Sequence, residues 1–263
     1  MSLFKRSLIQ VAITFVPIVT PRKGPRFNLG ELVDDVVGAE LQDGDVLVVS
    51  SKFVAMSEGR VVDLGTVVPS ERARSESRRL NIPPELCELV IRESDDVIGG
   101  VSGFMLAVKE GLLTPNAGID KSNVEHGKVV LYPRNPLESA TWLVDEVRFR
   151  RGVEVGVVVS DSRLMPTRKG TVGVALASAG VEAIVDLRGK PDLFGNVLKV
   201  TSQAIADDLC SGAQIVMGEA DESVPIVLVR GLGRRSTRGY GMSSFAVDPE
   251  QCVYMRSLGY RAR

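Results

Sequence analysis

The sequence contains few of the residues on which many enzyme active sites depend. Its 263 residues include a single histidine, His126, and three widely separated cysteines, Cys87, Cys210 and Cys252, without any CxxC pair. Multi-histidine metal sites are therefore excluded, and a disulfide framework or a zinc–thiolate site is disfavoured. His126 lies in the stretch VEHG, which favours a turn residue over a catalytic base. This cysteine usage is typical of a reducing compartment, so we expect a cytoplasmic protein.

The common phosphate-binding loops are also absent. Although the chain has 26 glycines, it contains no GxxxxGK[ST] motif and no GxGxxG after an expected strand. Phosphate binding would therefore need another architecture. Long apolar runs are missing as well, because Gln10, Thr14 and Pro17 interrupt residues 8–19 and the run is shorter than the ~20 residues of a membrane helix. This stretch predicts a β-strand rather than a secretion signal.

The sequence lacks an excess of charge of either sign. Its 32 Lys and Arg residues and 33 Asp and Glu residues give a net charge of −1, so no overall basic field exists for nucleic acid or an anionic membrane. We expect neither as a partner. The 44% hydrophobic and 25% charged residues are typical of a soluble globular protein. From Arg230 onward the chain has seven arginines and two acidic residues. Because these arginines form no basic run, an exposed or subunit-packing tail is favoured over a polyanion-binding site.

Helices are predicted where apolar residues recur at helical spacing. Asn28 with Glu31, and Asn135 with Glu138, form capping boxes that begin two of them. Trp142 lies in the second capped helix, where packing is a simpler interpretation than stacking on a ligand. Further helical patterns occupy residues 70–80, 83–94 and 203–218.

Apolar runs rich in β-branched residues predict strands between these helices. They occupy residues 45–51, 152–161 and 224–231, and residues 95–132 show a pattern of short strands and turns. The stretch SRLMPTRKG, residues 162–170, is expected to be a polar, basic loop. Together these patterns indicate an α/β fold with mixed sheets.

Three acidic residues follow apolar segments at the start of polar or glycine-rich loops: Asp120, Asp161 and Glu219. Ligands of α/β sheets bind outside strand ends, and carboxylate oxygens suit magnesium or manganese, so a shared metal site is one interpretation. The other is that each acid simply begins a turn. The nearby basic residues would complete a phosphate site, although surface solvation explains each of them equally well; they are Arg163, Arg168, Lys169, Arg188 and Lys190.

Five ordered motifs resemble those of the coenzyme F-420-0:L-glutamate ligase family over about residues 10–235. They are VVSSKFVAMSEGRVVDL, TPNAGIDKSNVEHG, VVVSDSRLMPTRKGTVGVALASAGV, DLRGKPDLFGNVLKVTSQAIADDL and VMGEADESVPIVLVRG. The resemblance implies a ligase domain over residues 8–235; the pattern along the chain itself adds a seam near 133–152 and a basic tail over 236–263. The resemblance also implies a family-specific nucleotide-binding α/β fold without a P-loop, assembled as an intertwined homodimer.

The resemblance further implies the reaction and the molecules that take part in it. Members of this family join L-glutamate to the carboxylate of a phosphorylated deazaflavin, coenzyme F-420-0, and then extend the tail through the γ-carboxylate. They use GTP and two divalent ions, Mg²⁺ or Mn²⁺, with K⁺ as an additional expectation. An acyl phosphate intermediate makes chemical sense, because phosphorylation turns the poor leaving oxygen of a carboxylate into a good one.

The resemblance also assigns roles to individual residues. Asp120 and Asp161 would be catalytic and would hold one divalent ion, while Ser162 and Glu219 would hold the second. The residues expected to line the nucleotide are Val16, Pro17, Ile18, Val19, Ser51, Lys52, Met56, Asn123, Met217, Gly218, Glu219, Ala220, Asp221, Glu222, Ser223 and Val224.

One position departs from the family pattern. Many relatives have lysine in the phrase SKAEGR, where this chain reads AMSEGR with Met56 at that place. A thioether cannot replace an ammonium beside phosphate, although Lys52 offers partial compensation. Three alternatives to the leading hypothesis stay open. They are a two-metal phosphohydrolase that uses the same acids, a paralogous amino-acid ligase acting on another carboxylate, and a non-catalytic nucleotide-binding protein, which Met56 and the basic tail suggest.

Overall fold

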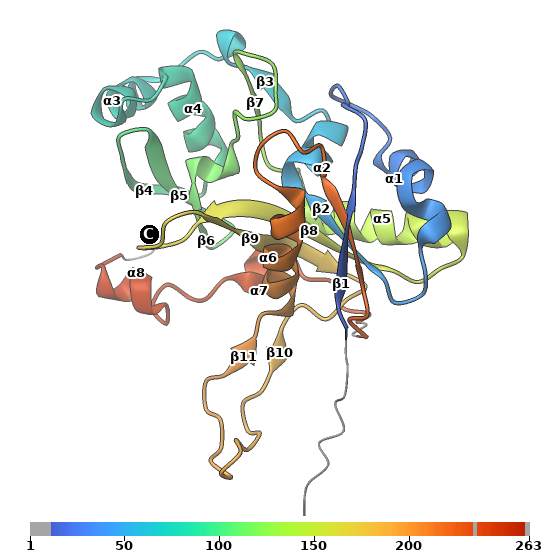
Figure 1. The fold of residues 1–263 in the computed structure, drawn as a ribbon. Helices are drawn as coiled ribbons and strands as arrows, with labels where there is room; N and C mark the ends of the chain where they lie inside the picture. The colour runs from blue at the N-terminus through green and yellow to red at the C-terminus, as the bar shows by residue number, and fades with distance from the viewer. Residues whose placement is uncertain (1–11, 234–235, 261–263) are drawn as a thin grey trace, which may run out of the picture.

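A five-stranded sheet forms the centre of the molecule, as the computed structural model shows for residues 12–233 and 236–260 (Figure 1). The strands β2 and β8 are parallel, and the other neighbouring pairs are antiparallel. The strand order is β1 (Thr14–Ile18), β12 (Ile226–Arg230), β2 (Val46–Ser50), β8 (Gly156–Leu164) and β9 (Thr171–Ala179). The predicted α/β class with mixed sheets is confirmed. Residues 8–11 of the predicted first strand lie outside the described residues.

Helices cover both faces of this sheet, which explains why its central strands are almost continuously apolar. The helices α1 (Leu29–Val37) and α5 (Pro136–Arg151) pack on one face, and α6 (Ile205–Met217) packs on the other (Figure 1). Both predicted capping residues are confirmed. The Asn28 side chain accepts a hydrogen bond from the Glu31 amide at 3.1 Å, and Asn135 accepts one from the Glu138 amide at 3.2 Å.

A second group of elements has its own apolar core beside the central sheet. The predicted helices α3 (Glu71–Leu80) and α4 (Pro84–Glu93) pack against a three-stranded antiparallel sheet. That sheet consists of β4 (Asp96–Val101), β5 (Phe104–Lys109) and β6 (Leu112–Pro115). The 3-10 turn η3 (Asn116–Gly118) and the antiparallel pair of β3 (Val61–Asp63) with β7 (Lys128–Val130) connect this group to the central sheet. The pattern of strands and turns predicted for residues 95–132 is therefore confirmed.

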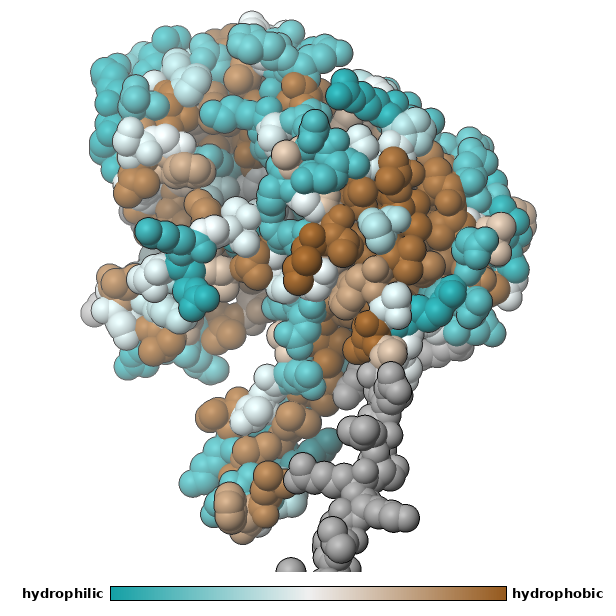
Figure 2. Space-filling model, viewed as in Figure 1, coloured by the Kyte–Doolittle hydropathy of each residue, from teal (hydrophilic) through white to brown (hydrophobic). Residues whose placement is uncertain are grey.

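Two short strands, β10 (Val185–Asp186) and β11 (Ser202–Gln203), form the base of an arm that projects from the body (Figure 1). At its tip Leu193 is 101% exposed and Phe194 is 91% exposed. Figure 2 shows apolar side chains along the arm and over the β1 side of the body. In the C-terminal segment, α7 (Met242–Phe245) and α8 (Val253–Ser257) follow Tyr240, which pairs with Ser178 at the sheet.

The structure corrects two predictions around the central strands. The stretch from Ser162 to Leu164 is not a loop, because β8 continues to Leu164 and stays paired with β9, which satisfies its backbone. A seven-residue helix, α2 (Ser51–Ser57), follows β2 directly, where no helix was predicted. The remaining short helices are η1 (Gly38–Glu40) and η2 (Leu64–Thr66). Within residues 12–233 and 236–260, no helix has the length and apolar character needed to cross a membrane.

Candidate functional site

A cavity of about 660 Å³ opens where the parallel pairing of β2 with β8 ends, at Ser50 and Ser160. Carboxyl ends of neighbouring parallel strands meet at one edge of a sheet, so side chains from distant parts of the sequence converge there. The residues lining the cavity are Val61 of β3 and members of six segments: 20–25, 50–56, 120–128, 160–162, the end of α6 at 214–217, and 218–225. Asp120, Asp161 and Glu219 all lie on its wall.

Asp161 is held in a network of buried polar groups. A shift in the β8–β9 register between Val159 and Ser160 precedes it, a type of irregularity that re-aims side chains near functional sites. Its carboxylate accepts hydrogen bonds from the Ser51 hydroxyl at 3.2 Å and from the Tyr132 hydroxyl, and Arg163 Nη2 lies at 3.8 Å. Burial raises the pKa of Asp161, although Arg163 opposes this shift.

Asp120 lies across the cavity in an environment dominated by a cation. Backbone hydrogen bonds with Val130, at 2.9 and 2.8 Å, fix its main chain, and its carboxylate accepts the Ser122 amide at 2.7 Å. Lys52 Nζ lies 2.8 Å from the other carboxylate oxygen. Burial acts to raise the pKa of Asp120, but the ammonium of Lys52 outweighs it and the pKa is lowered. Asp120 is therefore an ionised carboxylate at neutral pH.

Ser162 and Glu219 form a second polar cluster on the other side of β8. Successive residues of a strand point to opposite faces, so Ser162 faces away from Asp161 and toward α6. The Ser162 hydroxyl donates to Glu219 at 2.9 Å, and the Thr171 hydroxyl donates at 3.0 Å. Gln214 on α6 donates to the same carboxylate and to the Ser162 hydroxyl at 3.2 Å. The end of β8 thus carries two oxygen-rich clusters, one on each face.

Most of the residues expected to line a nucleotide lie on the wall of this cavity. They are Ser51, Lys52, Met56, Asn123 and the whole segment from Met217 to Val224. The Asn123 side chain donates to the Ala220 carbonyl at 2.8 Å and so joins two of the walls. Val16, Pro17, Ile18 and Val19 lie on or next to the edge strand β1 and do not line the cavity in the described part of the chain.

Several cavity residues were not predicted from the sequence. The segment Thr20–Pro25 directly follows the expected apolar stretch and brings Arg22 and Lys23 to the cavity, while the Thr20 amide donates to the Ser223 carbonyl at 2.9 Å. Gln214 was also missed. The signal for the first segment was the cation-rich stretch PRKGPR, which lies between a predicted strand and a predicted helix.

The basic residues considered for a phosphate site have other places in the structure. Arg163 is 11% exposed, donates a hydrogen bond to Tyr132 and forms an ion pair with Asp161, so it belongs to the internal polar network. Arg188 pairs with Asp186 at the base of the arm. Arg168, Lys169 and Lys190 do not line the cavity formed by the described residues. The cations on its wall are Arg22, Lys23, Lys52 and Lys128, and Lys128 is paired with Glu125.

The donor set suits hard divalent ions that also bind a phosphate ligand. Within the described ranges, no group of three or more His, Cys, Asp or Glu residues forms a complete metal cage. Mg²⁺ commonly binds through one or two carboxylates, with phosphate oxygens and water completing the shell. Asp120 with Asp161, and Ser162 with Glu219, offer this kind of incomplete oxygen set beside a cavity with several cations.

The mixed sheet and a cavity lined by both carboxylates and cations define an α/β protein with a polar, charged candidate site at one edge of its central sheet. The family comparison is more specific: the chain belongs to the F420-0:Gamma-glutamyl ligase family, whose profile matches residues 18–231. The resemblance inferred from five motifs is confirmed.

Three similar proteins are consistent with this family membership. The coenzyme F420:L-glutamate ligase of Methanocaldococcus jannaschii is 37% identical over 209 residues, which cover 79% of this chain and 82% of the relative. The enzyme of the same name from Methanopyrus kandleri is 38% identical over 218 residues, or 82% of this chain and 86% of the relative. That from Archaeoglobus fulgidus is 38% identical over 205 residues, or 78% and 82%.

Proposed function

We propose that this protein is a GTP-dependent ligase that joins L-glutamate to the carboxylate of coenzyme F-420-0 and then adds further glutamate through γ-linkages. Family membership supports the reaction class. The observation that carries the site assignment is the gathering of Asp120, Asp161 and Glu219 around one cavity, although 41 and 58 residues separate them along the chain.

In the proposed first step, an oxygen of the acceptor carboxylate attacks the γ-phosphorus of GTP. The bond from that phosphorus to the β–γ bridging oxygen breaks, and GDP leaves. The amino nitrogen of L-glutamate then attacks the acyl carbon of the resulting acyl phosphate and loses a proton to solvent, while inorganic phosphate departs. Two divalent ions would supply charge neutralisation for the phosphate oxygens.

The residues of this chain would hold and orient these groups. Asp120 and Asp161 would bind one ion, and Ser162 with Glu219 would bind the other. Lys52 already neutralises Asp120 at 2.8 Å, and its ammonium lies on the cavity wall where it can contact a phosphate oxygen. Arg22 and Lys23, on the opposite loop, would bind the nucleotide or the phosphodiester of the acceptor.

We also propose that the protein works as a homodimer. Leu193 and Phe194 at the tip of the arm are almost fully exposed, and Ile13, Val19 and Ile215 are exposed on the β1 side of the body. Exposed apolar side chains that gather on one surface mark protein interaction sites, and Figure 2 shows them gathered along the arm and the β1 side. A second copy would cover them. Analytical ultracentrifugation of the wild type and of a Leu193→Ser/Phe194→Ser variant tests this, because a dimer in both would remove the arm from the interface.

The activity is tested by incubating the protein with F-420-0, GTP, Mn²⁺ and L-glutamate. We expect release of GDP and a product whose mass has increased by one or more glutamate residues. Reactions without L-glutamate or without F-420-0 are the controls. GTP turnover that needs neither co-substrate would favour a phosphohydrolase, turnover only with a different carboxylate would favour a paralogous ligase, and binding without turnover would favour a non-catalytic protein.

A further inference from the structure

Tyr132 contacts both segments that carry the proposed ligands of the first ion. Its side chain is only 2% exposed, and its hydroxyl donates a hydrogen bond to Asp161. Its ring lies directly over Gly118, two residues before Asp120. A Cβ atom at Gly118 would fall 2.1 Å from two of the ring carbons, so the close approach requires glycine. One side chain therefore spans the space between the Asp120 segment and Asp161.

The hydrogen-bond direction at the Tyr132 hydroxyl is fixed by its neighbours. Arg163 Nη2 donates to the phenolic oxygen at 3.1 Å, and a guanidinium has no acceptor to offer. The single hydroxyl proton is thus left for Asp161. Arg163 Nε is buried and has no hydrogen-bond partner among the described residues, so this guanidinium is held here mainly by Tyr132 and Asp161.

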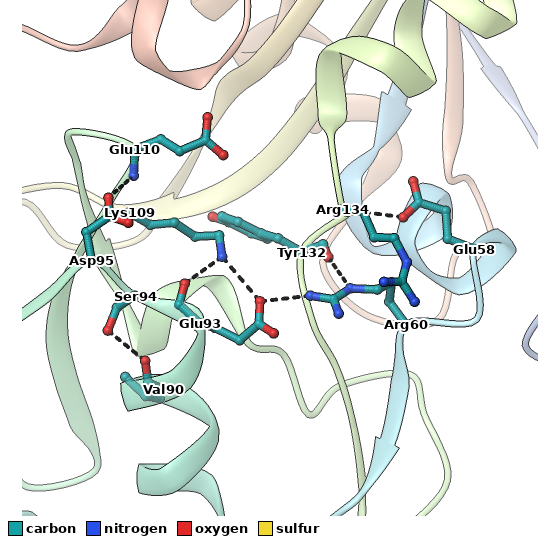
Figure 3. A network of polar contacts seen from close by, with 10 residues as sticks. All are labelled: Glu58, Arg60, Val90, Glu93, Ser94, Asp95, Lys109, Glu110, Tyr132 and Arg134. Carbon is teal, nitrogen blue, oxygen red and sulfur yellow. Dashed lines mark hydrogen bonds and ion pairs between the residues drawn. The ribbon is translucent and has the colours of Figure 1, made fainter.

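The backbone of Tyr132 is anchored from the opposite direction (Figure 3). Its carbonyl oxygen accepts a hydrogen bond from Arg60 Nε at 3.0 Å, and Arg60 pairs with Glu93 of α4 at 2.8 Å. Lys109 of β5 also pairs with Glu93, at 3.2 Å. These ion pairs are mostly buried, which favours a fixed geometry over a mobile one. The backbone of Tyr132 is therefore linked through Arg60 and Glu93 to the elements of the second apolar core, and its hydroxyl is hydrogen-bonded to β8.

We propose that Tyr132 is a positioning residue that sets the separation of Asp120 and Asp161 and thereby the affinity of this pair for a divalent ion. The inference rests on the proposed function, since it needs these two carboxylates to share an ion. Backbone hydrogen bonds between Asp120 and Val130 place the Asp120 segment and the segment leading to Tyr132 in one local unit. The Tyr132 hydroxyl is the direct side-chain link from that unit to Asp161.

The test is Tyr132→Phe, which keeps the ring over Gly118 and removes the hydroxyl. Groups that orient metal ligands typically contribute 10–100-fold to metal affinity, so we expect Mn²⁺ binding weakened by about 10–100-fold. Free Mn²⁺ is titrated by electron paramagnetic resonance, without nucleotide, on the full-length protein. Tyr240→Phe is the matched control, because Tyr240 is a buried tyrosine in the core on the α6 side of the sheet, and its Mn²⁺ affinity should equal that of the wild type.

A second readout separates positioning from loss of structure. In the ligase assay, Tyr132→Phe should need about 10–100-fold more Mn²⁺ for half-maximal activity and should recover most of the wild-type kcat at saturation. Equal Mn²⁺ affinity in the wild type and Tyr132→Phe would overturn the inference and leave the proposed function standing. Weakened Mn²⁺ binding in a protein whose wild type lacks ligase activity would overturn the proposed function alone. A wild type that binds no Mn²⁺ without nucleotide would overturn the inference, and the ligase assay would still decide the proposed function.

Discussion

Replacing Asp161 by alanine and by asparagine separates its structural role from its proposed role as a metal ligand. Alanine leaves the buried Tyr132 hydroxyl without its acceptor and the Arg163 guanidinium without its ion-pair partner. An unpaired buried donor costs about 1–3 kcal/mol, and breaking a buried ion pair costs about 3–5 kcal/mol. Because Arg163 lies at 3.8 Å and keeps its hydrogen bond to Tyr132, the loss of the ion pair should cost well below that range. The unpaired Tyr132 hydroxyl then sets the expected total of about 3 kcal/mol.

Asparagine should have a much smaller effect on stability. It keeps an acceptor oxygen for the Ser51 or Tyr132 hydroxyl and removes a carboxylate whose burial is unfavourable. We expect its free energy of unfolding to lie within about 1 kcal/mol of the wild type. The difference between the two variants, about 2–3 kcal/mol, corresponds to roughly 4–12 °C in Tm for a chain of this size.

The measurements are urea denaturation of all three proteins in a chelator and ligase activity in Mn²⁺. Both variants should lose activity, because neither retains the carboxylate. Equal stability of the alanine and asparagine variants would refute the buried network around Asp161. Full activity in the asparagine variant would remove Asp161 from the catalytic site, whatever its effect on folding.

Three further outcomes follow from the described contacts. The Ser70 hydroxyl and amide lower the pKa of Glu88 to about 2. The stability that ionised Glu88 adds to the fold is therefore complete above about pH 4.5 and is lost as the pH falls toward 2. In urea titrations, Glu88→Gln should lower the free energy of unfolding by about 2–3 kcal/mol at pH 7 and by little at about pH 2.5. Met56→Lys should tighten GTP binding about tenfold in calorimetry, and no gain would indicate that the phosphates lie elsewhere. Gly118→Ala, with φ near +76°, should lose about 2–4 kcal/mol of stability by displacing Tyr132, and an unchanged Tm would contradict the ring's position.

Local sequence signals predicted much of the fold because the interactions that they indicate form between residues close together in the chain. Asn28 and Asn135 cap their helices through side-chain hydrogen bonds that span three residues, and such contacts need no knowledge of the rest of the chain. The extension of β8 to Leu164 could not be predicted in this way. It depends on pairing with β9, where the partners of Ser162 and Leu164 are Gly173 and Thr171, 11 and 7 positions away in the chain.

In the candidate site, too, some residues were predictable from the local sequence and others were not. Asp120, Asp161 and Glu219 were visible as acids that follow apolar segments, a pattern present in the linear sequence. Tyr132 was not visible as a site residue, because its role comes from a ring that fits over Gly118 and a hydroxyl that reaches across to β8. Gln214 gains its position only from the packing of α6 on the sheet. Such contacts arise from tertiary packing and leave no mark in a single sequence.

The cavity wall combines residues of the central sheet with residues of a surface loop. Asp161 lies on β8, whereas Arg22 and Lys23 belong to a solvent-facing connection between β1 and α1. Substitutions in this loop would change the shape and charge of the cavity without disturbing the hydrogen bonds of the sheet. Related proteins can therefore change their ligand preference by substitutions in this surface loop while they keep the same acidic residues on the cavity wall.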